Sequence, residues 1–77
     1  MWLVVLDDEN VEENDRSRLL TQIGRYFPGV SLLYIAGTHS HTSERQARTS
    51  GAHYYISKPI SPAHFQYVLQ SFLHAQK

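Results

Sequence analysis

Residues 50–62 read SGAHYYISKPISP and form the most specific segment of the sequence. Residues 53–57 (HYYIS) are rich in aromatic and β-branched side chains, which are typical of a β-strand. Lys58-Pro59 closes that strand. Ser61 followed by Pro62 is typical of a helix start, with serine as the N-cap and proline at the first helical position. The stretch therefore predicts a strand that leads into a helix.

The helix after Pro62 has the clearest pattern in the chain. Its large apolar side chains recur at helical spacing and form one stripe, made of Phe65, Val68, Leu69, Phe72 and Leu73. Burying five such side chains contributes roughly 8–15 kcal/mol before the conformational entropy cost is subtracted. The stripe predicts a helix that covers a sheet.

Two further strand-and-helix units precede this one. Residues 3–6 (LVVL) and 30–36 (VSLLYIA) are continuous apolar runs, which are typical of buried parallel strands. Between them, apolar residues return at helical spacing at Leu19, Leu20, Ile23 and Phe27, and Pro28-Gly29 ends that helix. The sequence thus alternates strand and helix three times.

Candidate caps set the helix boundaries. Asn14 or Asp15 is a suitable N-cap for the first helix. Ser43 and Gln46 stand at capping-box spacing and predict the start of the second helix. Gly51 stands where a helix C-terminal glycine is expected.

The alternation of elements predicts an α/β fold in which three β/α units form a parallel sheet with right-handed crossovers. The 77 residues suffice for one small domain. In an apolar strand at the edge of such a sheet, backbone groups are free to recruit another chain.

Composition excludes several function classes. Seven basic and seven acidic side chains cancel, which argues against nucleic-acid binding and against a polybasic membrane anchor. The apolar start stops at Asp7, too early for a secretory signal or a membrane span. The absence of cysteine excludes disulfides and thiolate metal sites, and is compatible with a reducing, cytoplasmic setting.

Two segments, residues 3–7 (LVVLD) and 50–59 (SGAHYYISKP), resemble the receiver domains of two-component signalling. The first is similar to that family's third strand, which ends in the phosphoacceptor aspartate. The second is similar to its Gly-Ala, aromatic, apolar, Lys-Pro segment around the fifth strand. The resemblance implies one partial flavodoxin-like domain over residues 1–77, from the third strand to the fifth helix. It also implies a cytoplasmic response-regulator phosphoprotein that acts in phosphorelay signal transduction and is not a stand-alone enzyme.

The same resemblance implies roles for individual residues. Asp7 or Asp8 would be the phosphoacceptor and would contribute to a magnesium site. The strand pattern favours Asp7, whereas counting back from the following helix favours Asp8. Lys58 would pair with the phosphoryl group, and Ala36 and Tyr55 occupy the two switch positions. The partner would be a histidine kinase or another signalling protein.

The sequence also departs from the receiver pattern. The family's metal-holding acidic pair belongs to a first half that has no counterpart in these residues, so magnesium binding is weakly supported. Ala36 stands where the family has Thr or Ser, so a hydroxyl hydrogen bond to phosphate is lost. These departures favour an alternative, a pseudo-receiver that acts by protein contact without phosphorylation. Residues 3–6, central in an intact receiver, become an edge here, and we expect self-association or docking of another segment there.

Two polar segments have two interpretations each. The acidic residues from Asp7 to Glu13 could bind a metal, but acid runs are more often solvated loops beside a helix N-terminus. His39 and His41 could form a zinc pair, but the sequence shows no third ligand at suitable spacing, which favours a polar loop over residues 37–41.

Overall fold

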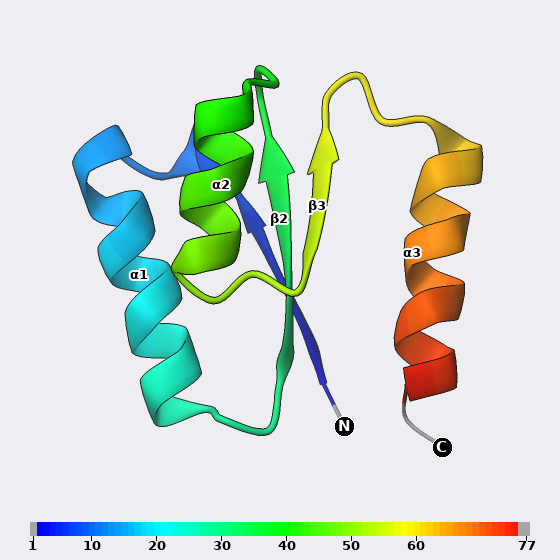
Figure 1. The fold of residues 1–77 in the computed structure, drawn as a ribbon, viewed down its shortest axis with the longest axis horizontal. Helices are drawn as coiled ribbons and strands as arrows, with labels where there is room; N and C mark the ends of the chain where they lie inside the picture. The colour runs from blue at the N-terminus through cyan, green and yellow to red at the C-terminus, as the bar shows by residue number, and fades with distance from the viewer. Residues whose placement is uncertain (1, 76–77) are drawn as a thin grey trace.

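The computed structural model describes residues 2–75 and shows strands and helices in alternation (Figure 1). The strands are β1 (Leu3–Asp7), β2 (Ser31–Ala36) and β3 (Tyr54–Ser57). The helices are α1 (Glu13–Tyr26), α2 (His41–Thr49) and α3 (Pro62–Ala75), and a short 3-10 helix, η1 (Asp8–Asn10), follows β1. The predicted α/β class with three β/α units is confirmed.

The sheet is parallel and has the strand order β1-β2-β3. Leu6 lies opposite Tyr34, and Tyr34 lies opposite Tyr55. Because all three strands run in the same direction, their carboxyl ends meet at one edge of the sheet, where open α/β folds place their functional residues. The strand order also places β1 at a lateral edge, as predicted.

Helices cover the two faces of the sheet unequally: α1 and α2 pack on one face, and α3 packs on the other (Figure 1). Successive strand residues point to opposite faces. One core therefore gathers Leu6, Leu20, Leu32, Tyr34, Ala36, Ala47, Ala52 and Tyr55 under α1 and α2. The smaller core under α3 is made of Leu33, Ile35, Ile56 and Val68.

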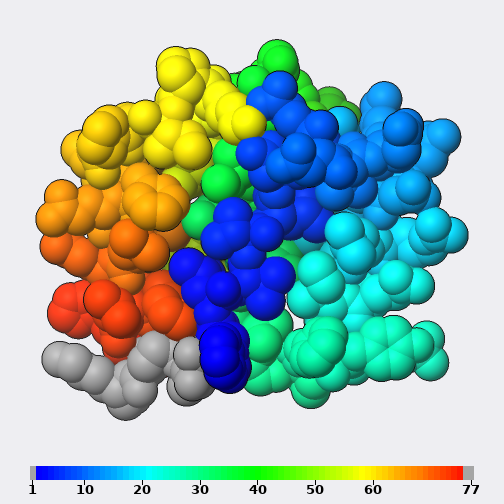
Figure 2. All heavy atoms as spheres, turned by 180° about the vertical axis from the view of Figure 1, so that it is seen from behind, coloured from blue at the N-terminus to red at the C-terminus, as the bar shows by residue number. Residues whose placement is uncertain are grey.

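The face that carries α3 is not covered as far as β1. Figure 2 shows β1, in deep blue, lying in the open between α3 and α1. Val5, on this side of the strand, is 50% exposed, and Trp2 is 75% exposed. An apolar hollow lined by Trp2, Leu3, Val4, Phe27 and Val30 lies at the start of the strand. The sheet thus presents apolar surface along its first strand.

Two predicted helix starts are corrected. Helix α1 begins at Glu13 after Glu12, which makes no side-chain capping bond, so Asn14 and Asp15 lie inside the first turn and neither is the cap. Helix α2 begins at His41, because the extended backbone of Ser40 lets its Oγ accept the Ser43 N–H at 3.0 Å. The cap is therefore three residues earlier than Ser43.

Two other boundary predictions are confirmed. The Oγ of Ser61 accepts the backbone N–H of His64 at 3.4 Å, at the start of α3. Gly51 has a φ of 122°, in the region that favours glycine, just after α2. Within residues 2–75, no helix combines the length and apolar character needed to cross a membrane.

Candidate functional site

Asp7 and Lys58 meet at the carboxyl edge of the sheet. Asp7 ends β1, and Lys58 follows β3 directly. The Nζ of Lys58 lies 2.9 Å from Oδ2 of Asp7 and also donates a hydrogen bond to the Glu9 carboxylate. The backbone N–H of Lys58 donates to the carbonyl of Ala36 at 2.8 Å, which fixes the lysine against the end of β2. Strand order thus brings together two residues that are remote in the sequence.

These contacts favour the charged forms of both groups. The hydrogen bond from Lys58 holds the pKa of the Asp7 carboxyl below its usual value, and a second bond, from the Glu9 N–H, acts in the same direction. Hydrogen bonds to Glu9 and then to Asp7 raise the pKa of Lys58 to about 12. At neutral pH the edge therefore presents an ionised carboxylate beside an ammonium group.

Asp8 has a different environment and is 5% exposed. Its Oδ2 accepts the Tyr34 hydroxyl at 2.8 Å, and its Oδ1 accepts the Gly37 N–H at 2.8 Å. The Arg16 guanidinium lies 3.8 Å from Oδ2. The interpretation of the acidic segment as a solvated loop is therefore wrong at Asp8, because this carboxylate turns inward and ties η1 to the end of β2.

Tyr34 and Tyr55 form a stacked pair on the face under α1 and α2. Their ring centroids are 5.8 Å apart and their planes differ by 5°. Burial, together with the bond to Asp8, raises the pKa of the Tyr34 hydroxyl well above its usual value. Burial also raises the pKa of Tyr55, whose hydroxyl lies 3.3 Å from Nδ1 of His39. The residue at the predicted aromatic switch position is thus turned inward, with its hydroxyl directed to the β2–α2 connection.

Ala36, at the other predicted switch position, is the last residue of β2 and is fully buried. Its side chain brings no hydroxyl to the edge, and the nearby Thr38 is exposed. The contribution of Ala36 to the site is its carbonyl, which holds the backbone of Lys58.

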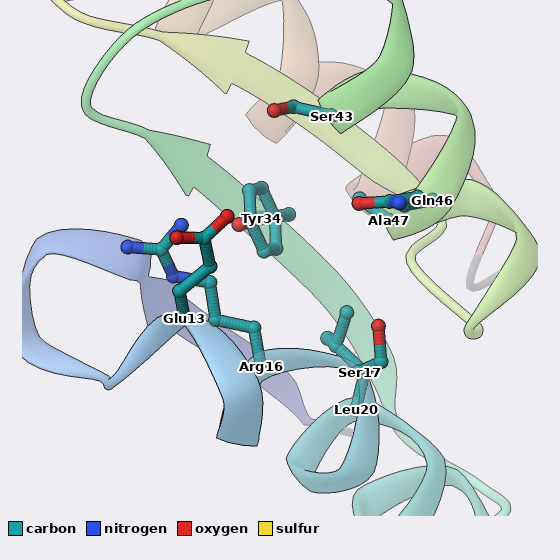
Figure 3. A pocket seen from close by; sticks show the side chains of 8 residues that line it. All are labelled: Glu13, Arg16, Ser17, Leu20, Tyr34, Ser43, Gln46 and Ala47. Atoms are coloured by element: carbon teal, nitrogen blue, oxygen red, sulfur yellow. The ribbon is translucent and has the colours of Figure 1, made fainter.

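A small pocket lies between α1 and α2, with Tyr34 at its base (Figure 3). A wider polar hollow beside it reaches the carboxyl edge and is lined by Asp8, Glu9, Glu13, Arg16, Gly37, Thr38, Ser40 and Ser43. Asp7 and Lys58 do not line either pocket. At the carboxyl edge this hollow lies beside Asp8 and Glu9.

The predicted magnesium ligands, Asp7 and Asp8, are unequal in the structure. Both oxygens of Asp8 already accept protein hydrogen bonds in a buried position. Magnesium requires near-ideal octahedral geometry and keeps several waters, and a carboxylate that is 5% exposed and already bound by protein donors leaves little room for that shell. Asp8 therefore does not fit the ion, and magnesium binding at Asp7 stays a prediction.

The structure also brings a third possible metal ligand, Glu44, close to His39 and His41. His39, His41 and Glu44 each offer a ligand atom, and these atoms lie within 4.8 Å of one another. Both histidines are exposed and Glu44 is half-buried. Glu44 was not predicted as a ligand, because His41 was expected to lie in a loop, whereas it is the first residue of α2.

No protein-family model matches the sequence, and no curated protein matches it. Two solved structures are similar in fold. One is a pilus assembly-related protein from Burkholderia pseudomallei, with a TM-score of 0.77 and 16% identity over 90% of this chain and 51% of that chain. The other is a CheY-like response regulator receiver domain protein from Methanospirillum hungatei, with a TM-score of 0.78 and 23% identity over 96% of this chain and 58% of that chain.

These likenesses concern the fold. The chain has the fold of part of a receiver domain, which confirms the predicted recognition and the flavodoxin-like class at that level. It spans between half and three fifths of the length of the two solved structures.

Proposed function

We propose that this chain is a receiver-like signalling module in which Asp7 accepts a phosphoryl group. The observation that carries the proposal is the ion pair of Asp7 and Lys58 at the carboxyl edge of the sheet, 2.9 Å between Oδ2 and Nζ. An ionised carboxylate is a nucleophile for phosphoryl transfer, and an adjacent ammonium group stabilises the charge on the transferred oxygens.

The chemistry needs few groups. A carboxylate oxygen of Asp7 attacks the phosphorus of the donor, the bond from phosphorus to the leaving group breaks, and the leaving group departs with its electron pair. The side chain of Asp7 is thereby converted into an acyl phosphate. Lys58 moves its charge from the carboxylate to the phosphoryl oxygens, while Glu9 keeps the ammonium group at the edge. A histidine kinase is the proposed physiological donor, and the cytoplasm is the proposed location.

Asp8 is a poorer acceptor for a structural reason. Adding a phosphoryl group to either oxygen displaces the Tyr34 hydroxyl or the Gly37 N–H. Each buried donor left without a partner costs about 1–3 kcal/mol. Of the two aspartates left open by the sequence, Asp7 is therefore our proposed acceptor.

A second candidate function is a pseudo-receiver that signals through protein contact alone. Ala36 favours it, because the last side chain of β2 carries no hydroxyl that could bond to a phosphoryl group. The open first strand also favours it. In the described part of the chain β1 pairs with β2 alone, and Val5 is 50% exposed, so backbone and apolar surface are both available to a partner. We propose a second copy of this chain as that partner, paired along residues 3–6.

Intact-mass spectrometry after incubation with acetyl phosphate and magnesium tests the first function. We expect a single phosphoryl adduct, labile to base, that is lost in Asp7→Asn and retained in Asp15→Asn, a matched change on the exposed side of α1. Asp8→Asn, shown to be folded by circular dichroism, is expected to retain it. A folded wild-type chain that forms no adduct would rule out the acceptor and leave the pseudo-receiver.

A further inference from the structure

The connection between β2 and α2 carries a cluster that is separate from the pair of Asp7 and Lys58. It is made of His39, His41 and Glu44, whose ligand atoms lie within 4.8 Å of one another. We propose that these three side chains bind a zinc ion. The proposal uses neither Asp7 nor Lys58, so it does not depend on the proposed phosphoryl chemistry.

The start of α2 creates the cluster. Ser40 is the N-cap, and its Oγ and carbonyl oxygen each accept a 3.0 Å bond, from the backbone N–H groups of Ser43 and Glu44 respectively. His41 is therefore the first helical residue, and Glu44 follows it at a spacing of three, which places both on the same side of the helix. His39 lies just before the cap, with its ring 5.5 Å from that of His41 and edge-on to it. The cap thus fixes the helical backbone that carries His41 and Glu44, and His39 directly precedes it.

The ligand types select the metal. Two imidazoles with one carboxylate suit zinc and related transition-metal ions, whereas magnesium and calcium prefer oxygen ligands alone. Zinc bonds of about 2.0–2.2 Å in tetrahedral geometry place ligand atoms about 3.3–3.6 Å apart. The present separations are up to 4.8 Å, so the proposed site requires side-chain rotations of the two exposed histidines and the half-buried Glu44 to bring the ligand atoms into that range. Three protein ligands leave the fourth position to water.

Two neighbouring side chains contact the proposed ligands His39 and Glu44. Metal-binding histidines usually direct their second ring nitrogen to an oxygen, which sets the tautomer of the ring. Nδ1 of His39 lies 3.3 Å from the Tyr55 hydroxyl, and in the proposed site Nε2 would bind the ion. Glu44 accepts a 3.1 Å hydrogen bond from Arg48 on Oε2, which leaves Oε1. The cluster therefore has the outer contacts of a metal site as well as the ligands.

Calorimetric titration of the full chain with zinc chloride tests the proposal. We expect one ion per chain, with affinity lowered at least ten-fold in His41→Gln and in Glu44→Gln. His64→Gln, at an exposed position of α3, is the matched control, and this variant should bind zinc as the wild type does. No binding by the wild type, or equal affinity in His41→Gln and wild type, would overturn the proposal.

NMR spectra of the imidazole rings distinguish zinc binding at this cluster from weak binding to scattered surface histidines. One equivalent of zinc should shift the ring signals of His39 and His41, and the ring signals of Tyr55 through its contact with His39. The signals of His64 should stay in place. Equal shifts at His64 would show weak binding to any surface histidine and would contradict a built site.

Discussion

The ammonium group of Lys58 lies 2.9 Å from a carboxylate oxygen of Asp7, so the ends of β3 and β1 are joined across β2, which separates them in the sheet. No hydrogen-bonded strand pairing links β1 to β3 directly. The ion pair therefore connects the two lateral strands at the edge where the proposed chemistry takes place.

Removing the ammonium group should slow the proposed phosphoryl transfer. In Lys58→Met we expect the rate of adduct formation from acetyl phosphate to fall at least ten-fold, because the ammonium group that stabilises charge on the transferred oxygens is then missing. Timed mass spectra measure this rate. Arg25→Met, which removes a cation at the far end of α1, should leave the rate unchanged. An unchanged rate in Lys58→Met would show that the ion pair is structural only.

The ion pair should also make stability depend on pH in a defined way. The folded pKa of Asp7 is lowered from 3.8, so its contribution is present above that value and lost as pH falls through the lower folded pKa. The folded pKa of Lys58 is raised from 10.5 to about 12, so its contribution is present below 10.5 and lost as pH rises through about 12.

We therefore expect the difference in unfolding free energy between wild type and Lys58→Met to be constant at intermediate pH. It should shrink below pH 3.8 and above pH 10.5. Urea unfolding across the pH range measures the difference, and a carbon NMR titration of the Asp7 carboxyl measures its pKa directly. A carboxyl of Asp7 that titrates at the same pH in both proteins would contradict the prediction.

Asp8 should matter for stability more than any exposed acid. Asp8→Ala leaves the buried Tyr34 hydroxyl and the Gly37 N–H without an acceptor, and we expect a loss of about 2–4 kcal/mol in urea unfolding. Asp15→Ala breaks an exposed pair with Arg18 and should cost less than about 1 kcal/mol. In a cycle with Tyr34→Phe, a coupling near zero would show that the hydroxyl bond to Asp8 contributes nothing.

The open strand predicts concentration-dependent association. Sedimentation velocity should show dimers of the wild type that dissociate in Val5→Glu, because the charge is placed on apolar surface beside the free edge. Tyr67→Glu puts the same charge on another exposed apolar residue, on α3, and should leave the dimer intact. A wild-type chain that stays monomeric at high concentration would refute pairing along β1.

The sequence predicted the elements that depend on apolar periodicity. The first two strands were predicted from continuous apolar runs, the third from its aromatic and β-branched residues, and α3 from its apolar stripe. The Ser61 cap was also readable, since Pro62 leaves few alternatives for the start of the helix. The edge position of β1 followed from the resemblance to part of a receiver.

The site was less predictable, because it depends on boundaries of a few residues. Ser40 and Ser43 are both acceptable caps by local rules, and the choice decides whether His41 is helical and faces Glu44. Asp7 and Asp8 are adjacent carboxylates in the sequence. The strand ends at Asp7 and η1 turns Asp8 inward to Tyr34, a long-range contact that no local pattern contains.

The direction of the strands has a practical consequence for handling the protein. Strand β1 starts at Leu3, and helix α3 runs antiparallel to the strands and ends at Ala75. The start of β1 and the end of α3 therefore lie at the end of the sheet opposite Asp7 and Lys58 (Figure 1). We therefore expect an affinity tag, a fluorescent fusion or a sensor surface that is joined before Leu3 or after Ala75 to leave the carboxyl edge accessible. Immobilised formats can then present donors and metal ions to that edge without obstruction.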